Sequence, residues 1–236
     1  FLGYKKILAI IKSSDGIIFE SKENAEFWRN KINKPSFIVE DTPQHECIYI
    51  DYLKRKKKLI WVGSFHTSIY LSNFYNCFKM FYEHGYEIKI LGGTKKISND
   101  LKRLSIKHSY LKEYNLDNLA EELTSSRISF APMENKELFN LRGNLKAKVS
   151  MGYGCLVVAS NNAMHRRLIE HKKTGYLFNN EDELKNIISD LENNTKSSKI
   201  AFEGNKYVAT NFTRLSHATK LTEIGEKLIN LNLDKE

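Results

Sequence analysis

Two hydrophobicity patterns alternate along the chain. Short apolar runs, typical of buried strands, are separated by stretches in which apolar residues recur at helical spacing. The predicted strands are residues 16–19, 36–39, 59–62, 87–91, 106–110, 127–131, 156–159 and 175–178. The predicted helices are residues 2–12, 22–31, 69–82, 99–104, 116–124, 144–152, 163–171, 181–192, 198–211 and 213–231.

This alternation predicts an α/β fold in which a doubly wound parallel sheet is covered by helices on both faces. Ligands of such folds bind at the carboxyl ends of the strands. The loops that follow Val62, Leu91, Tyr110, Ala131 and Ser160 are therefore where we look for chemistry.

The polar stretch 44–58 divides the chain into two parts. Before it, a strand, a helix and a second strand form a single β-α-β unit, which ends near residues 41–43. After it, strands and helices alternate without a further break. We therefore expect one part at residues 1–57, which includes a solvated linker, and a larger part at residues 58–236.

Composition indicates a globular protein, with 41% hydrophobic and 28% charged residues. No apolar run approaches the roughly 18 residues of a membrane-spanning helix. The chain opens at Phe1 without a signal-peptide pattern, which is typical of a piece cut from a longer protein. Cys47, Cys77 and Cys155 are too widely spaced for a metal site or a disulfide framework, so we expect a reducing, cytoplasmic setting with Cys155 in the core.

The net charge of +9 allows binding of nucleic acid, anionic lipid or a phosphorylated ligand. Basic residues are scattered apart from the run 54–58, which begins at Lys54 and ends at Lys58. We interpret this run as a solvated linker or as a contact with the inner face of an anionic membrane. Exposed basic and aromatic residues do not interleave on one face, so we do not expect nucleic acid as a partner.

The most informative segment lies around the predicted helix at 144–152. Gly143 gives the backbone freedom to turn into this helix, whose first N–H groups at Asn144, Leu145 and Lys146 form a seat for an anion. Arg142 and Lys146 add positive charge on either side. This pattern predicts a diphosphate-linked ligand, although an ordinary helix start with basic surface residues has the same sequence.

Several segments resemble the retaining GT-B glycosyltransferases of family 4, the glycosyl transferases group 1. The likeness is strongest at residues 140–178, where Lys146, Met151-Gly152, Gly154 and the run 157–160 match the donor-site segment, and where 168–178 matches the segment that follows it. Residues 59–63 and 88–93 resemble the first two strands of the donor domain, and 14–21 resembles the last strand of the acceptor domain.

The resemblance implies an enzyme that binds a nucleotide-sugar between two Rossmann-like domains. Such enzymes transfer the sugar with retention to a saccharide or lipid-linked acceptor, usually without a metal, and the nucleotide-sugar is a co-substrate and not a cofactor. Residues 1–57 would then be the tail end of the acceptor-side domain plus the linker, and residues 58–236 the donor-binding domain.

The resemblance also implies site residues. Those expected at the donor diphosphate are Arg142, Gly143, Asn144, Leu145, Lys146, Gly63 and Ser64. Candidates for sugar or base contacts are His66, Gly92, Gly93, Tyr110, Leu111 and His165. For His66 and His165, plain surface positions are the alternative.

The sequence departs from the family at three points. The family's two glutamates, eight positions apart, fall on Leu141 and Val149. In the family, the first works near the transferred sugar and the second usually accepts hydrogen bonds from ribose hydroxyls, and neither Leu141 nor Val149 can replace them. The basic residues that usually follow the first donor strand are missing after Ser64. The first part is too short for a complete domain, so we expect exposed apolar surface there. These departures leave open a second hypothesis, a non-catalytic binding or partner subunit with the same fold.

Overall fold

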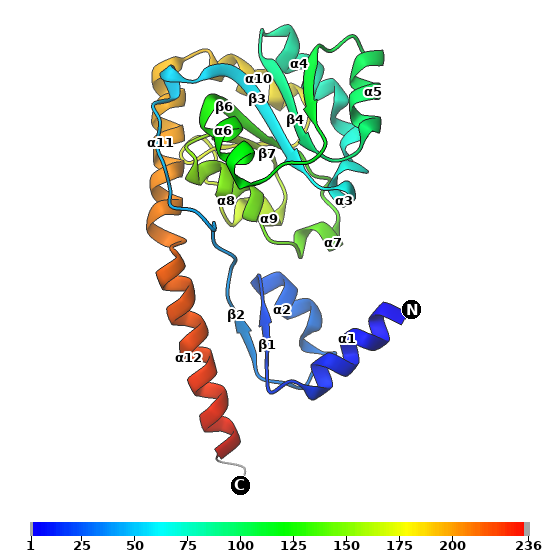
Figure 1. The fold of residues 1–236 in the computed structure, drawn as a ribbon, viewed down its shortest axis with the longest axis vertical. Helices are drawn as coiled ribbons and strands as arrows, with labels where there is room; N and C mark the ends of the chain where they lie inside the picture. The colour runs from blue at the N-terminus through cyan, green and yellow to red at the C-terminus, as the bar shows by residue number, and fades with distance from the viewer. Residues whose placement is uncertain (1, 234–236) are drawn as a thin grey trace.

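The computed structural model describes residues 2–233, and its N-terminal unit is one β-α-β motif preceded by a helix (Figure 1). Its elements are α1 (Leu2–Ser13), β1 (Ile17–Phe19), α2 (Lys22–Arg29) and β2 (Ser36–Ile38), with β1 and β2 parallel. The Ser21 hydroxyl accepts a 3.1 Å hydrogen bond from the Asn24 N–H and so caps α2. The expectation that the first strand is buried is wrong for Ile18, which is 46% exposed.

The second unit contains a parallel sheet of six strands, in the order β5-β4-β3-β6-β7-β8. Numbered from its own first strand, this order is 3-2-1-4-5-6, the doubly wound arrangement of Rossmann-like folds. β3 and β6 are parallel neighbours, but the order in which successive strands are added to the sheet reverses between them, which is the switch point where such folds bind ligands. The strands are β3 (Lys56–Gly63), β4 (Glu87–Gly92), β5 (His108–Leu111), β6 (Ser126–Ala131), β7 (Leu156–Ser160) and β8 (Tyr176–Phe178).

Helices cover both faces of this sheet because successive strand residues point to opposite sides. Leu59, Ile128 and Leu156 belong to one buried cluster, together with residues of the helices on that face. Their neighbours Ile60 and Val157 face the other side. The first face carries α4 (Tyr75–Glu83), α5 (Lys95–Arg103) and α10 (Glu181–Leu191), and the second carries α6 (Leu116–Ser125) and α8 (Leu145–Gly152).

Several predicted helices differ in extent from the observed ones. The predicted helix 69–82 is two pieces, the 3-10 turn η2 (Leu71–Phe74) and α4, and the short helix α3 (Phe65–Ser68) that precedes them was not predicted. The predicted helix 163–171 ends early, as α9 (Ala163–Arg166), because the chain turns there into a loop in which Lys172 has a positive φ of 65°. The helix predicted at 99–104 is the second half of α5. A short helix α7 (Glu137–Asn140) was not predicted.

The predicted solvated linker at 44–58 is partly wrong. It includes a 3-10 turn, η1 (Tyr52–Lys54), and β3 begins at Lys56 within the basic run. Arg55 is 4% exposed and Lys58 is 7% exposed, because the first binds backbone carbonyls and the second pairs with Glu122 at 2.7 Å. The run is therefore not a uniformly solvated stretch, and its two buried members are unavailable to a membrane.

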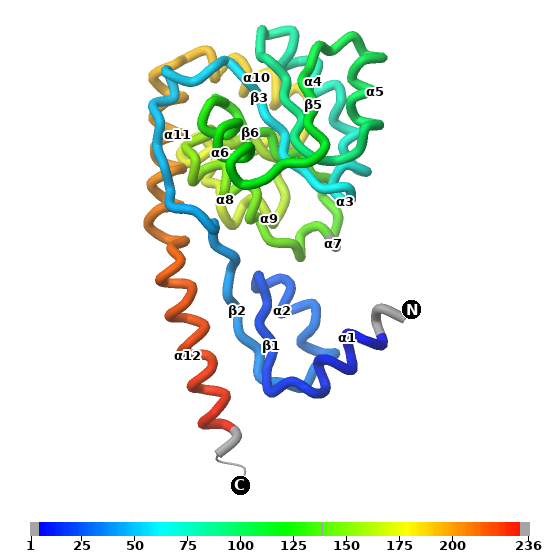
Figure 2. The backbone as a smooth tube through the Cα atoms, in the orientation of Figure 1, coloured from blue at the N-terminus to red at the C-terminus, as the bar shows by residue number. Residues whose placement is uncertain are grey.

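The two units are also connected by the C-terminal helices. α11 (Asn194–Asn211) packs beside α8, and α12 (Arg214–Leu233) continues downward along the N-terminal unit, where Leu228 lies against Gly16 (Figure 2). The linker follows α11 in the opposite direction, and Asn205 donates to the Ile48 carbonyl at 3.3 Å. Two chain segments thus cross between the units on the same side.

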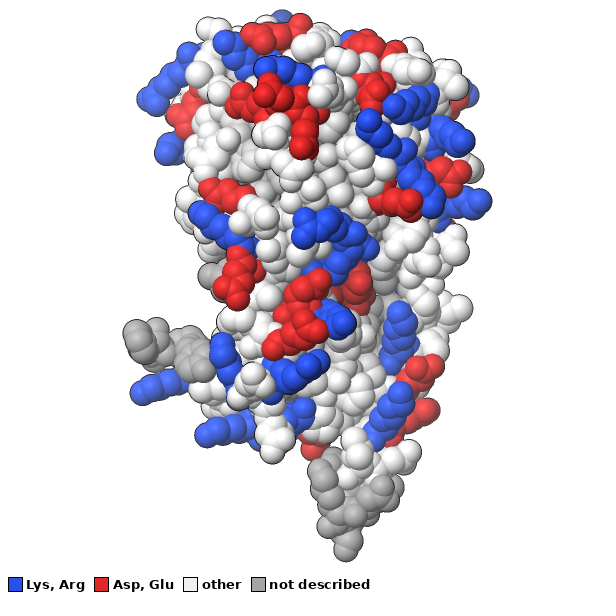
Figure 3. Space-filling model, turned by 180° about the vertical axis from the view of Figure 1, so that it is seen from behind, with Lys and Arg blue, Asp and Glu red and all other residues white. Residues whose placement is uncertain are grey.

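The surface carries two further features. Lys and Arg are interspersed with Asp and Glu on the face shown in Figure 3, so the positive charge is not gathered into one patch there. The expected exposed apolar surface is confirmed at the N-terminal unit and α12, where Ile38 is 48% and Ile229 is 61% exposed.

Within residues 2–233, no helix is both long and apolar enough to cross a bilayer. All three cysteines lie within these residues and are free thiols.

Candidate functional site

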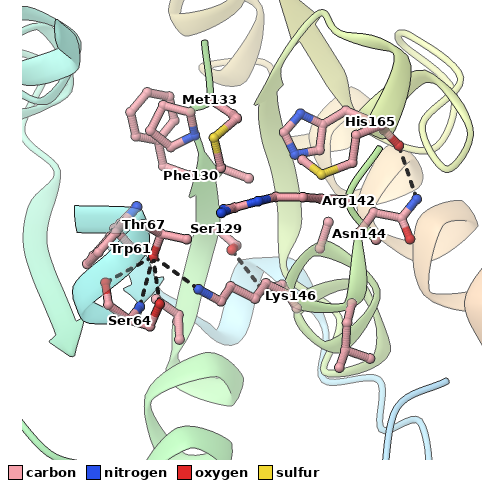
Figure 4. Close-up of a pocket in the computed structure, with 18 residues that line it drawn as sticks. Trp61, Ser64, Thr67, Ser129, Phe130, Met133, Arg142, Asn144, Lys146 and His165 are labelled. Atoms are coloured by element: carbon pink, nitrogen blue, oxygen red, sulfur yellow. Dashed lines mark hydrogen bonds between the residues drawn. The ribbon is translucent and has the colours of Figure 1, made fainter. Parts of the chain in front are cut away.

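A cavity of about 340 Å³ opens at the switch point of the sheet (Figure 4). Its floor is formed by the ends of β3 and β6, with Trp61 and Val62 on one strand and the run 129–131 on the other. The loop that leads into α8 forms one wall, and the start of α3 forms the wall opposite. The cavity therefore occupies the position that the parallel topology predicts for a ligand.

The predicted diphosphate residues meet in this cavity. Arg142, Gly143, Asn144, Leu145 and Lys146 all line it. Arg142 extends across the cavity toward Phe130 and Met133, and Lys146 points toward α3 (Figure 4). None of the residues that line the cavity is acidic, so the two cations face no competing carboxylate within it.

Lys146 joins the two walls. Its ammonium donates a 3.2 Å hydrogen bond to the Thr67 hydroxyl, and the same hydroxyl oxygen accepts a 2.8 Å bond from the Ser64 N–H. The surrounding protein atoms and the nearby Arg142 charge lower the pKa of Lys146 to about 8. A bound anion would reverse this effect, because an opposite charge favours the protonated amine.

The first turn of α8 is left uncapped by its own N-cap side chain. Asn144 is buried, and its amide group donates to the Met164 carbonyl at 3.1 Å instead of capping the helix. The positive end of the helix dipole and its first N–H groups are therefore directed at the cavity without a side-chain acceptor from Asn144.

Gly143 differs from what the sequence predicts. It is not among the residues with positive φ, so backbone freedom does not explain it. A Cβ atom at this position would instead lie 1.6 Å from the Glu20 carboxylate oxygen. A side chain here would therefore displace the Glu20 carboxyl group, which belongs to the N-terminal unit.

His165 lines the cavity and is 3% exposed, so its alternative position on a solvated helix surface is wrong. Its Nδ1 lies 2.9 Å from the Ser160 carbonyl oxygen, and a carbonyl can only accept. Burial lowers the pKa of His165 to about 4, with a further lowering from the Arg167 charge. The ring is therefore neutral at pH 7, with its proton on Nδ1 and a free lone pair on Nε2.

Of the remaining predicted site residues, Ser64 lines the cavity. Those that do not line it are Gly63, His66, Gly92, Gly93, Tyr110 and Leu111. Gly63 and Gly92 are packed against each other at the ends of β3 and β4, where a Cβ on Gly92 would lie 2.0 Å from the Gly63 carbonyl oxygen. His66 is exposed, with its ring edge-on to Phe65.

Three polar residues of this cavity are not predicted from the sequence. Thr67 follows Ser64 at the spacing of a capping box, and that spacing was the available signal. Ser129 and Ser150 also line the cavity, and their hydroxyls are 2.8 Å apart. They lie on different elements, β6 and α8, and a lone serine in either element gives no signal of a site.

A second, apolar pocket of about 220 Å³ adjoins the cavity and shares Val62, Leu145, Lys146 and Ser150 with it. Its walls include Val149 from α8, Tyr114 from the loop after β5, and Leu116, the first residue of α6. The loop directly follows Tyr110 and Leu111, where the sequence predicts sugar or base contacts. Val149, at the position of the family's second glutamate, therefore faces a pocket and not the protein core alone. Leu141 is the C-cap of α7 and lines neither pocket.

A family model described as glycosyl transferases group 1 matches residues 56–194. The chain belongs to this family. The matched segment contains every strand of the second sheet and all residues that line the cavity. The second pocket is lined by matched residues together with Gln44 and His45, which precede the segment. A comparison with curated proteins gives no match.

Solved structures with the same fold are GT-B glycosyltransferases, which confirms the predicted fold class. A sucrose-phosphate synthase from Thermosynechococcus elongatus is 14% identical, with a TM-score of 0.75 over 94% of this chain and 60% of that one. Anabaena HepE in complex with UDP-glucose is 14% identical, with a TM-score of 0.71 over 91% of this chain and 64% of that one.

A TarM variant from S. aureus, in complex with fondaparinux, α-GlcNAc-glycerol and UDP, is 13% identical, with a TM-score of 0.74 over 94% of this chain and 46% of that one. The chain thus spans between 46% and 64% of the length of these three proteins.

Proposed function

We propose that this chain forms the nucleotide-sugar side of a glycosyltransferase. Residues 58–236 would bind the donor, and residues 1–57 would belong to the acceptor side. The whole protein would transfer a hexosyl group to a polysaccharide or lipid-linked acceptor, with retention and without a metal. The observation that supports this most is the convergence of Arg142, Lys146 and the uncapped start of α8 on one acid-free cavity at the switch point of the sheet.

The arrangement suits a leaving group that gains negative charge. When the bond between the sugar and the diphosphate breaks, charge grows on the phosphate oxygens. Arg142 can hold such oxygens through paired N–H groups, and Lys146 adds a point charge. Because these groups are already oriented in the cavity, they stabilise the transition state without further reorganisation.

Each of the two pockets suits one remaining part of the donor, either the sugar or the nucleoside. The neutral ring of His165 can accept a hydrogen bond from a sugar hydroxyl through Nε2. The apolar pocket beside Val149 and Tyr114 suits the flat faces of a nucleoside. Lys146 lines both pockets, which is the position expected of a residue at the phosphates between sugar and nucleoside.

The test is a thermal-shift and calorimetry screen with UDP, GDP and their sugars. A ligand at a hundredfold over its Kd should stabilise the protein by about 2.7 kcal/mol. The Lys146→Ala variant should bind at least about tenfold more weakly, because hydrogen bonds to charged groups contribute about 1.5–3 kcal/mol. Lys96→Ala, an exposed lysine on α5, is the matched control and should leave the Kd unchanged. No stabilisation by any nucleoside diphosphate would refute the proposal.

A non-catalytic binding or partner subunit is the second candidate, and one observation favours it. No carboxylate lines the cavity, and the positions of the family's glutamates hold Leu141 and Val149. Such a subunit would bind a nucleotide-sugar without turning it over. Release of free sugar or transfer to an acceptor by the full-length protein would eliminate this candidate.

A further inference from the structure

Acidic residues of the N-terminal unit face the second unit along one edge. Glu40 pairs with Lys148 of α8 at 2.7 Å, and Glu23 pairs with Arg167 at 2.7 Å. Arg167 also donates to the Arg142 carbonyl at 2.6 Å, so this ion pair reaches the backbone of the diphosphate loop. The two units therefore meet directly behind the residues that line the cavity.

Glu20, the residue after β1, makes the closest approach to this loop. An added Cβ on Gly143 would lie 1.6 Å from Glu20 Oε1 and 2.0 Å from Glu20 Cδ. Gly143 stands between Arg142 and Asn144 in the wall of the cavity. The Glu20 carboxyl thus lies against the backbone of a residue that forms the wall of the cavity.

Opposing effects act on the pKa of the Glu20 carboxyl. Burial and the neighbouring Asp41 carboxyl raise the pKa of Glu20 to about 7, against the opposing effects of the Gly143 backbone and Lys148. Charged and titratable groups surround the junction on both units. The acidic groups are Glu23 on α2 and Glu40 and Asp41 after β2. The basic groups are Arg142 in the loop before α8, Lys146 and Lys148 on α8, Arg167 after α9 and His217 on α12. Both protonation states of Glu20 are therefore populated near neutral pH.

Resting on the proposed function, we propose that Glu20 is a positioning residue of the donor site. Its carboxylate contacts Gly143 and competes with the diphosphate for the loop from Arg142 to Asn144, so the donor binds to the form in which Glu20 is neutral. Two like charges next to one glycine oppose each other, so the bound anion favours the neutral carboxyl.

The balance of the step is simple. Around pH 7 to 8, where Glu20 of the free protein is partly ionised, binding of the nucleoside diphosphate takes up part of one proton from solution, and this proton resides on Glu20. At pH 6 Glu20 is already mostly protonated, so binding takes up little more. The affinity of the wild-type protein for the nucleoside diphosphate should therefore fall, relative to that of Glu20→Gln, as the pH rises from 6 to 8.

Glu20→Gln removes the titration and keeps the size of the side chain. We would measure binding of UDP and of inorganic pyrophosphate by calorimetry at pH 6, 7 and 8, in pairs of phosphate-free buffers that differ in ionisation enthalpy. If binding raises the pKa of Glu20 by one unit, the wild-type Kd should weaken about fivefold more than that of Glu20→Gln between pH 6 and 8. Titration of Lys146 and of the ligand itself is common to both proteins and cancels in the comparison.

The control is Glu26→Gln, which removes a carboxyl from the exposed side of α2 and should behave like wild type. Equal proton uptake by wild type and Glu20→Gln would overturn this inference and leave the proposed function standing. If neither UDP nor pyrophosphate binds to either protein at any pH, the proposed function fails, and this inference fails with it. A larger proton uptake by wild type than by Glu20→Gln at pH 7 to 8 would support it.

Discussion

At the scale of single residues, Val149 has the clearest consequence for ligand binding. Its side chain lines the apolar pocket beside Lys146, where the family resemblance places a carboxylate that accepts hydrogen bonds from ribose hydroxyls. Valine offers only apolar contact there. We therefore expect this protein to bind nucleotides with little contribution from the ribose hydroxyls.

The Val149→Glu variant should recover that contribution. A hydrogen bond between a carboxylate and a hydroxyl is worth about 1.5–3 kcal/mol, so UDP should bind at least about tenfold more tightly. The gain should be absent for 2′,3′-dideoxy-UDP, which lacks the hydroxyls. Val149→Leu, which adds volume without polarity, controls for packing. Calorimetry of both ligands provides the measurement, and an equal effect on both would contradict the placement of the ribose.

Gly154 shows how a motif glycine can be explained by its neighbours. Its φ is +75°, a conformation that favours glycine, and an added Cβ would lie 2.5 Å from the Arg55 guanidinium. The resemblance identified Gly154 as a family position. The structure adds that a buried arginine from the linker fills the space beside it.

At the scale of elements, Arg55 stabilises the start of β3 through hydrogen bonds. Arg55 donates to the backbone carbonyls of Ile50 at 2.9 Å, Leu123 at 3.0 Å and Tyr153 at 2.6 Å. These acceptors belong to the linker, to α6 and to the turn after α8. One buried side chain thus connects three segments that are distant in sequence.

Replacing Arg55 with Met should lower the free energy of unfolding by at least about 3 kcal/mol, because several buried carbonyls lose a charged donor. The neighbouring Lys54→Met, in the same basic run but exposed, should change it by less than about 0.5 kcal/mol. Urea denaturation followed by circular dichroism measures both. Equal stability of the two variants would show that the carbonyls find other partners.

The elements also show what can be predicted from sequence. Strands such as β4 and β7, and the helices α6, α10 and α11, were predicted to within a few residues because their apolar patterns are regular. The pieces η2 and α4 were merged, since aromatic residues continue the helical spacing through the 3-10 turn. In the site, Arg142 and Lys146 were predicted because they are close in sequence. Thr67 and Glu20 were not, because their partners lie on other segments of the chain.

At the scale of the whole molecule, the two units differ in how well they are packed. Among the side chains described in residues 5–39, the buried apolar ones are Phe19 and Val39, whereas the six-stranded sheet has a large buried cluster on each face. Stability is correspondingly uneven, because local opening depends on the apolar contacts that must be broken.

Amide hydrogen exchange followed by mass spectrometry should reveal this difference. We expect peptides covering β1, α2 and β2 to exchange at least about tenfold faster than those covering β3, β6 and β7. Addition of UDP should slow exchange in the loop at residues 140–146 and, through the ion pairs of Glu23 and Glu40, in the N-terminal unit. Uniform protection across both units would contradict this account.

The two chain crossings between the units have a mechanical consequence. They lie side by side at Lys148, which contacts Glu40 and the Asp41 carbonyl on the linker and the Phe212 ring at the junction of α11 and α12. Two bodies joined along one edge rotate most easily about that edge, so relative motion here should have one principal axis. The displacement should be smallest at Lys148 and should grow toward the opposite edge, where α1 and α7 lie (Figure 1). In the proposed transferase, substrates should therefore enter and leave from that edge, while the contacts of Lys148 change least.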